Sequence, residues 1–192
     1  MPTANQAALD FLLTRRSRPA KTLTAPYPDR AALEPILRAA LRSPDHKKLE
    51  PWRLMVLEKP ALERLSVLVE RLGPETGQSA EDTDKDRDAY ARSGLAVAVV
   101  LSPVEHPKVP VQEQVLSAGA VCLSLLNAAL ASGWGANWLT GWSSHDATFC
   151  GEGLGLRPDE RLAGVIHLGS ERAAPPERPR PDPEVKITWV SE

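Results

Sequence analysis

The apolar positions of this chain recur at helical spacing in four segments. Between residues 33 and 41 they stand at i, i+3, i+4, i+7 and i+8, which is the stripe of an amphipathic helix with one buried face. Residues 8–14 and 60–72 carry similar stripes. Residues 115–131 are apolar on every side, slightly short for a bilayer, and interrupted by small polar residues. This last segment is therefore predicted to be the central core helix of a soluble protein.

Four other segments have the pattern of core strands, and a fifth follows near the C-terminus. The core candidates are residues 53–58, 95–101, 134–139 and 161–168. The first two are nearly continuous apolar runs, which is typical of strands covered on both faces. A proline-rich stretch at 173–184 leads to residues 185–190, where apolar and polar side chains alternate. Because this last strand is tethered by an extended arm, we expect it to pair with the edge of a second subunit.

Two segments leave more than one interpretation open. If Asp29 caps the second helix, Pro35 falls inside that helix and removes a hydrogen bond. The alternative is a start near Glu34, which puts Pro35 at the first helical position. Residues 73–88 are acidic and poor in apolar side chains, so they form either a mobile excursion or a solvated helix.

Composition excludes several classes of function. The chain has 192 residues, of which 42% are hydrophobic and 25% charged, as in an ordinary globular enzyme domain. Its net charge of −2 argues against nucleic-acid binding. Cys122 and Cys150 are too few for a disulfide framework or a cysteine metal site, and we expect no metal. The N-terminus has no secretory pattern, which predicts a cytoplasmic protein without a membrane anchor.

Two basic clusters are the strongest candidates for chemistry. Arg15, Arg16 and Ser17 follow the first helix, and paired guanidinium groups bind phosphate in bidentate fashion. The alternative is structural, since cations at a helix C-terminus interact favourably with the helix dipole. The second cluster is the loop 42–52, which combines cations, an imidazole and a tryptophan and suits an anionic ligand with a ring system. Its alternative is a solvated basic loop with Trp52 as a core anchor.

Several motifs, in a fixed order along almost the whole chain, carry a resemblance to a known family. They are Arg15-Arg16-Ser17, Pro44-Asp45-His46-Lys47, Pro51-Trp52, Lys108-Val109-Pro110 with Glu113-Gln114 and Ser117-Ala118-Gly119, and Gly133-Trp134-Gly135 with Trp138 and Gly141. The chain resembles the FMN-dependent nitroreductases, and among them the small bacterial YdjA-type subgroup. The resemblance implies an α+β fold with a central mixed β-sheet flanked by helices. It also implies one FMN-binding domain over 1–192 and a homodimer that exchanges the C-terminal arm 170–192.

The same resemblance implies a site for FMN. It assigns the phosphate and ribityl end to Arg15, Arg16 and Ser17, and it assigns completion of the site to Arg42 and His46 of the partner. Trp138, Leu139 and Thr140 would line the ring, and NAD(P)H would approach near Ala128, Ala129, Leu130, Ala131, Ser132 and Gly133. No residue is certain to be catalytic, but Lys47 is a candidate for stabilising negative charge on the reduced flavin.

The implied activity is an NAD(P)H oxidoreductase that reduces nitroaromatic, quinone or activated-alkene acceptors by a ping-pong mechanism. Three departures from the family pattern are Glu50 in place of a glutamine, Leu139-Thr140 in place of Arg-Ser, and Gln112 in place of an aromatic. Glu50 and Leu139 favour one alternative, a flavin-binding protein of the same fold with little turnover. The other alternative is an oxygen-dependent flavin-cleaving or dehalogenating relative, for which 73–88 is the candidate lid.

Overall fold

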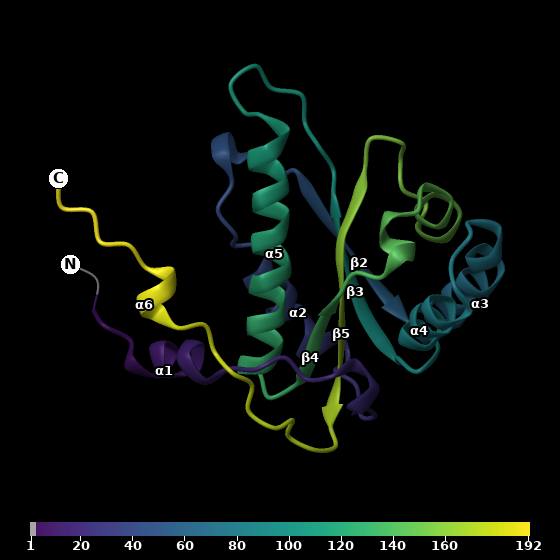
Figure 1. Ribbon diagram of the computed structural model, residues 1–192, viewed down its shortest axis with the longest axis horizontal. Coiled ribbons are helices and arrows are strands. Elements are labelled where there is room, and N and C mark those ends of the chain that lie inside the picture. Colours follow the sequence, from purple (N-terminus) through teal and green to yellow (C-terminus); the bar gives the residue numbers. More distant parts are fainter. Residues whose placement is uncertain (1–2) are drawn as a thin grey trace.

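A computed structural model describes residues 3–192, and its core is one β-sheet between helices (Figure 1). The helices are α1 (Gln6–Thr14), α2 (Arg30–Ala40), α3 (Lys59–Glu75), α4 (Ala80–Ala91), α5 (Val111–Ala131) and α6 (Pro183–Lys186). The strands are β1 (Leu23–Thr24), β2 (Trp52–Glu58), β3 (Leu95–Leu101), β4 (Gly135–Leu139) and β5 (Arg161–Glu171). Short helical turns are η1 (Ala20–Thr22), η2 (His46–Lys48), η3 (Trp142–His145) and η4 (Phe149–Gly153).

The sheet is organised around β5, its longest strand. The strand order is β1-β5-β3-β2. Strand β4 is outside this order and pairs with residues 165–169 of β5, directly before the residues of β5 that pair with β1. The expected α+β class is therefore found. All four pairings between the described strands are antiparallel, so the expectation of a mixed sheet is wrong within this chain. Two of these pairings join consecutive strands: α3 and α4 connect β2 to β3, and η3 and η4 connect β4 to β5.

Burial distinguishes the two strands that were expected to be covered on both faces. All seven residues of β3 are buried, as predicted, because β3 lies between β5 and β2. The prediction holds only in part for β2: Met55 and Leu54 pack against the cores on opposite faces, but only Leu57 is buried. The physical reason is its place at the end of the sheet order, where one edge of the strand has no neighbouring strand among the described residues.

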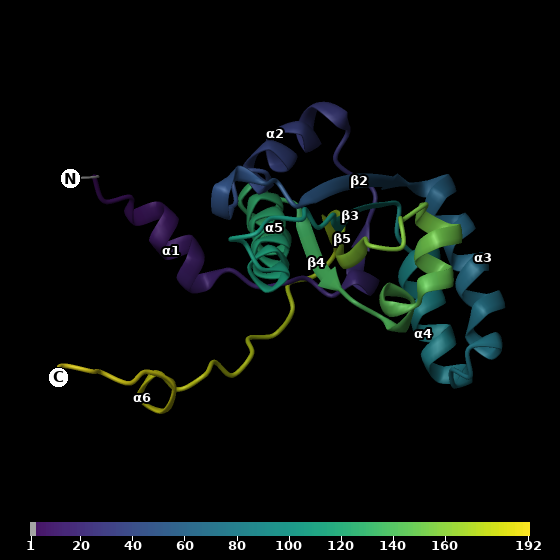
Figure 2. The same ribbon diagram turned by 90° about the horizontal axis from the view of Figure 1, so that it is seen from above.

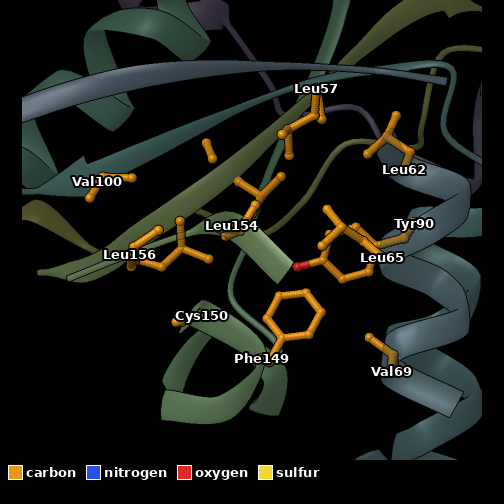
Figure 3. Close-up of a cluster of buried hydrophobic side chains, with 14 of the residues drawn as sticks. Leu57, Leu62, Leu65, Val69, Tyr90, Val100, Phe149, Cys150, Leu154 and Leu156 are labelled. Atoms are coloured by element: carbon orange, nitrogen blue, oxygen red, sulfur yellow. The ribbon is translucent and has the colours of Figure 1, made fainter. Parts of the chain in front are cut away.

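Two hydrophobic cores lie on opposite faces of the sheet. Figure 2 shows α5 and α2 on one side of the sheet and α3 and α4 on the other. In the core on the α3 side, Phe149 of η4 packs against Leu65 and Val69 of α3 and lies beside Tyr90 of α4 (Figure 3). The tyrosine and phenylalanine ring centroids are 5.5 Å apart, which is the spacing of a favourable aromatic pair.

Helix α5 is the central helix that the apolar pattern predicts. It packs against α2, β3, β4 and β5, and it buries Val121, Cys122 and Leu125 completely. By length and composition alone, this helix could also cross a membrane. Its position in the fold is that of a core helix, although Leu116 and Leu123 remain exposed.

The structure answers the two questions that the sequence left open, namely where the second helix begins and what the acidic residues 73–88 form. The Asp29 side chain accepts a hydrogen bond of 2.8 Å from the Ala32 amide, so α2 begins at Arg30 and contains Pro35. The acidic stretch ends α3 and then forms most of α4, which is a helix rather than a mobile excursion. It is also more than a solvated helix, because Thr83, Asp86 and Tyr90 on its inner side are buried.

Both ends of the chain lie away from the sheet. Figures 1 and 2 show α1 and α6 projecting from the same side of the molecule, and the side chains of both helices are unburied in the described chain. The predicted strand at 185–190 is wrong, since Pro183–Lys186 is a short helix capped by Asp182 and no strand follows. The arm has left the sheet by this point, so these residues have no strand partner within the described chain, and Trp189 is 91% exposed.

Candidate functional site

The first basic cluster lies where the chain passes from α1 to the sheet. Helix α1 ends at Thr14, and the Arg15 amide caps it by donating to the Phe11 carbonyl at 2.7 Å. The segment then joins β4: the Arg18 amide donates to the Ala136 carbonyl at 2.8 Å. The Asn137 side-chain amide donates to the Arg18 carbonyl, also at 2.8 Å. The arginines are thereby fixed beside the start of β4.

A cavity of about 270 Å³ opens at this junction, and four arginines line it. The full lining is Arg15, Arg16, Ser17, Pro19, Asn137, Arg178 and Arg180. The Nε atoms of Arg15 and Arg16 and the Nη1 of Arg16 are buried and have no hydrogen-bond partner among the described residues. Burial, and secondarily the charge of Arg180, lowers the pKa of Arg15. Buried donors without acceptors are unfavourable, so this cavity is suited to an anion with several oxygens.

Half of this arginine cluster comes from the C-terminal arm and was missed by the sequence analysis. Arg178 and Arg180 stand in the proline-rich stretch that was interpreted only as a spacer. Arg180 reaches back to the first cluster, with its Nη2 3.5 Å from the Arg15 carbonyl, and it pairs with Glu177 at 3.0 Å. The available signal was the repeated Arg-Pro pair at 178–181, which places two cations on an extended chain.

The second basic cluster is held on α5 by hydroxyl groups. Ser117 of α5 accepts from the Trp52 indole at 3.0 Å and donates to the Pro44 carbonyl at 2.8 Å. Ser43 contacts Ser124 at 3.0 Å. Trp52 therefore has the anchoring role that the structural alternative gave it.

The loop between these anchors is conformationally strained. Lys47, Lys48 and Glu50 have φ angles of 64°, 53° and 49°, in the left-handed region that side chains with a Cβ seldom adopt. The Asp45 carboxylate stabilises the turn by accepting from the Glu50 amide at 2.6 Å. Strain of this kind is concentrated at functional sites, where surrounding structure holds it in place.

The candidate side chains of this loop lie near the first turn of α5. His46 Nδ1 is 2.6 Å from Glu113 Oε2, and both side chains are about half-exposed. Arg42 and Lys47 are exposed. The contact with Glu113 leaves the Nε2 side of the imidazole free for another partner.

The two basic clusters lie at opposite ends of α5. His46 contacts Glu113 near the beginning of the helix, whereas Arg18 joins β4 just after the turn that ends it. A 21-residue helix is roughly 30 Å long, so a flavin phosphate bound by Arg15 and Arg16 lies far from the same chain's His46. A single chain does not bring Arg15, Arg16 and Ser17 together with Arg42 and His46.

The ring-lining candidates follow each other at the end of β4 but face two different cavities. Trp138 is 36% exposed and packs over Gly164 of β5, where an added Cβ would stand 2.0 Å from its indole nitrogen. It lines a cavity of about 650 Å³ between α5 and the η3–η4 region. Leu139 and Thr140 line another cavity of about 240 Å³ against α4.

One wall of the larger cavity contains a buried carboxylate that the sequence analysis did not single out. The Glu160 side chain is fully buried and accepts from the Arg53 guanidinium at 2.8 and 3.0 Å. It also accepts from Ser102 at 2.6 Å and from the Arg157 amide at 2.9 Å. The hydrogen bond from Arg53 is the main reason why the pKa of Glu160 lies well below its usual range. This network fixes the start of β5 against β2.

The six residues assigned to NAD(P)H lie in the last turn of α5 and the turn after it. Ala129 is completely buried in the core, whereas Ser132 and Gly133 are exposed, and Gly133 has a φ of 82°. Within the part of the chain that the structure describes, none of the six lines the three cavities above. Their role as the NAD(P)H site stays a prediction.

Comparison with known proteins identifies the family of this chain. The model of the nitroreductase family matches residues 12–170. The chain belongs to the nitroreductase family. It is 35% identical over 183 residues to "Putative NAD(P)H nitroreductase YdjA" of Escherichia coli, which covers 95% of this chain and 98% of that protein. It is 36% identical over 166 residues to a protein of similar description from Haemophilus influenzae, covering 85% of this chain and 88% of that protein.

Solved structures agree with this assignment at the level of the fold. A nitroreductase-like family protein from Bacillus cereus has a TM-score of 0.78 at 24% identity, covering 99% of this chain and 98% of that one. A nitroreductase with bound FMN from Bacteroides fragilis has a TM-score of 0.74 at 17% identity, covering 98% and 100%. The nitroreductase-like fold and the class of oxidoreductase that the motifs implied are thereby confirmed.

Proposed function

We propose that this nitroreductase-family protein is an FMN-dependent oxidoreductase that uses NAD(P)H to reduce small acceptors. The observation that carries the proposal is the cavity of four arginines with buried, unpartnered guanidinium donors. A flavin phosphate supplies the oxygens that these donors lack. The bound FMN in the Bacteroides fragilis structure of the same fold supports this choice of anion.

FMN fits the arrangement of side chains along β4. Arg15, Arg16 and Ser17, with Arg178 and Arg180 of the arm, would hold the phosphate. Asn137 lines the same cavity, and Trp138, Leu139 and Thr140 follow it directly along the chain at the end of β4. One strand would therefore carry contacts for the phosphate end and for the ring.

We further propose that the complete site needs two copies of the chain, each a single domain over residues 1–192. His46 is about a helix length from the arginine cavity, so the partner would supply it, together with Arg42 of the same loop. Exposed apolar side chains on α1, α5 and the arm, among them Leu13, Leu116 and Trp189, supply surface for such a homodimer. In the exchange of the arm 170–192, Arg178 and Arg180 would stay at the cavity of their own chain, and the exposed residues after them, such as Trp189, would pack on the partner.

The chemistry follows from this arrangement. Bound FMN would supply the redox chemistry that links NAD(P)H oxidation to reduction of a nitroaromatic, quinone or activated alkene, in a ping-pong cycle. The protein binds and orients the cofactor, and Lys47 would place a positive charge near the reduced ring. NAD(P)H would approach by the exposed turn at Ser132 and Gly133. The expected location is the cytoplasm, where NAD(P)H is available.

A direct test combines flavin content with turnover. The purified dimer should be yellow, retain FMN on dialysis, and oxidise NADH or NADPH when menadione or nitrofurazone is added. Arg15→Ala and Arg16→Ala should each weaken FMN binding by at least about tenfold, since charged hydrogen bonds contribute roughly 1.5–3 kcal/mol. Arg30→Ala, which removes an exposed arginine at the start of α2, is the matched control and should bind FMN as the parent does. A colourless parent that takes up no FMN would disprove the proposal.

A further inference from the structure

Asp86 is a buried carboxylate on α4, a helix whose other acidic side chains are exposed or partly exposed. Only 8% of this residue is exposed, and it lies on the inner side of α4 between Thr83 and Tyr90. Burying a carboxylate is unfavourable unless it accepts hydrogen bonds. Asp86 Oδ2 accepts from the backbone amide of Ser143 at 2.9 Å. The buried charge thus links α4 to the turn that follows β4.

The carboxylate also determines how closely α4 approaches this turn. Gly141 lies directly under Asp86, and a Cβ added to it would stand 1.6 Å from Oδ1. A residue larger than glycine would therefore push the turn and the helix apart. One helical turn further, the Tyr90 hydroxyl lies 3.5 Å from Ser143 Oγ. Helix α4 therefore contacts Ser143 through two side chains, Asp86 and Tyr90, and Gly141 lies close against the Asp86 carboxylate.

This turn is continuous with the residues proposed to line the flavin ring. Leu139 and Thr140 precede it, and Figure 2 shows the end of β4 running toward α4. The cavity of about 240 Å³ at this place is lined by Leu139, Thr140, Gly141 and Trp142, and on the α4 side by Asp82, Lys85, Asp86 and Ala89. Leu139 is the last residue of β4 and pairs with Val165 of β5, so beyond it the position of the backbone at Thr140 depends on how the turn is anchored.

We propose that Asp86 is a positioning residue. It accepts a hydrogen bond from the Ser143 amide and packs against Gly141, and it thereby keeps the Leu139–Thr140 backbone in place beside the flavin ring. The inference rests on the proposed function. The proposed role requires an acceptor oxygen at the position of Asp86 Oδ2, and it does not require a negative charge. Asparagine has that shape and keeps an acceptor oxygen, so it should replace aspartate with little loss.

The test compares Asp86→Ala with Asp86→Asn in the full-length, FMN-loaded protein. Asp84→Ala is the matched control, because Asp84 is on the same helix but is exposed and pairs only with Arg87 among the described residues. Three quantities are measured: hydrogen exchange of the peptide that contains Ser143, the circular dichroism of the bound flavin, and kcat/KM for menadione. Exchange is also measured without FMN.

Asp86→Ala should retain FMN, because the arginine cavity is untouched. Its Ser143 peptide should exchange at least about tenfold faster and its kcat/KM should fall by a similar factor, the order expected when a buried amide donor is left without an acceptor. The flavin signal should change as well. Asp86→Asn and Asp84→Ala should stay near the parent in all three. If Asp86→Ala does not fold, Gly141→Ala replaces it and should show the same losses.

Two results would overturn the inference. One is an alanine variant, at position 86 or 141, with parental exchange, flavin signal and kinetics. The other is equal impairment of Asp86→Asn and Asp86→Ala with unchanged exchange, which would make the charge the important property. If the parent itself binds no FMN, the proposed function fails, while the exchange measurement still reports whether Asp86 anchors the turn.

Discussion

His167 is a histidine that the fold keeps neutral. It lies in β5 with 2% of its surface exposed, its Nδ1 has no partner among the described residues, and Tyr90 lies 6.1 Å away between ring centroids. Burial lowers the pKa of His167 to about 4. The unfolded chain takes up this proton more readily, so the stability is fully present above pH 6.5 and is lost as the pH falls toward 4.

This predicts a stability loss in a defined pH window. The difference between an ordinary histidine pKa of 6.5 and about 4 corresponds to about 3 kcal/mol of unfolding free energy. His167→Gln should flatten the decline between pH 6.5 and 4 in urea unfolding curves, whatever its stability at pH 7. His145→Gln, at an exposed histidine, is the control and should keep the parental slope. A parental slope in His167→Gln would refute the assignment.

Glu160 predicts a second loss at lower pH. Its pKa is lowered, chiefly by the hydrogen bond from Arg53, so its contribution is present above the ordinary glutamate value and is lost as the pH falls below it. Glu160→Gln should destabilise the protein at pH 7 by roughly 1.5–3 kcal/mol, because the buried acceptor of Arg53 loses its charge while Arg53 itself stays partly exposed to water. Unfolding curves of Glu160→Gln and of Asp159→Asn, its exposed neighbour, measure this. Equal stability of the two variants would contradict it.

At the scale of elements, the sequence predicted those parts whose partners are close in the chain. The buried strand at 95–101 and the helix at 33–41 follow from local pattern, and the structure has both. The failures concern partners that are distant in the sequence. The apolar run of β2 could not reveal its place at the sheet edge, and the alternation at 185–190 could not reveal that a short helix would end at Lys186 with no strand after it. Asp86 looked like one of many solvated acids because its partner amide is 57 residues away.

The C-terminal arm gives a prediction at this scale. Removing residues 173–192 keeps β5 intact, including the ion pair of Glu171 with Arg18 at 3.1 Å, and deletes Arg178 and Arg180. The truncated protein should keep a cooperative thermal transition but lose most of its FMN and its dimeric elution volume. The full-length Arg178→Ala/Arg180→Ala double variant separates the effects, since it should lose FMN and stay dimeric. A flavin-loaded dimer after truncation would show that the arm is dispensable.

For the whole molecule, the distance between the two basic clusters predicts complementation between damaged subunits. Arg15→Ala and Arg42→Ala homodimers should each lose FMN, because each damages both shared sites. A hybrid dimer, isolated with two different affinity tags, should place both lesions in one site and leave the other intact. It should therefore bind about half the parental FMN at saturation. A hybrid without FMN would mean that each site belongs to one chain.

The separation of Arg15 from His46 along α5 has a consequence for how the protein responds to dilution. If each cofactor contacts two chains, cofactor binding and subunit association are linked equilibria, and each must strengthen the other to the same extent. The apparent Kd for FMN should then rise as the protein is diluted below its dimer dissociation constant, and added FMN should shift that constant downward. Fluorescence titrations of FMN at several protein concentrations would reveal the linkage. In a cell, the amount of this protein would then help to set how much of it holds its cofactor.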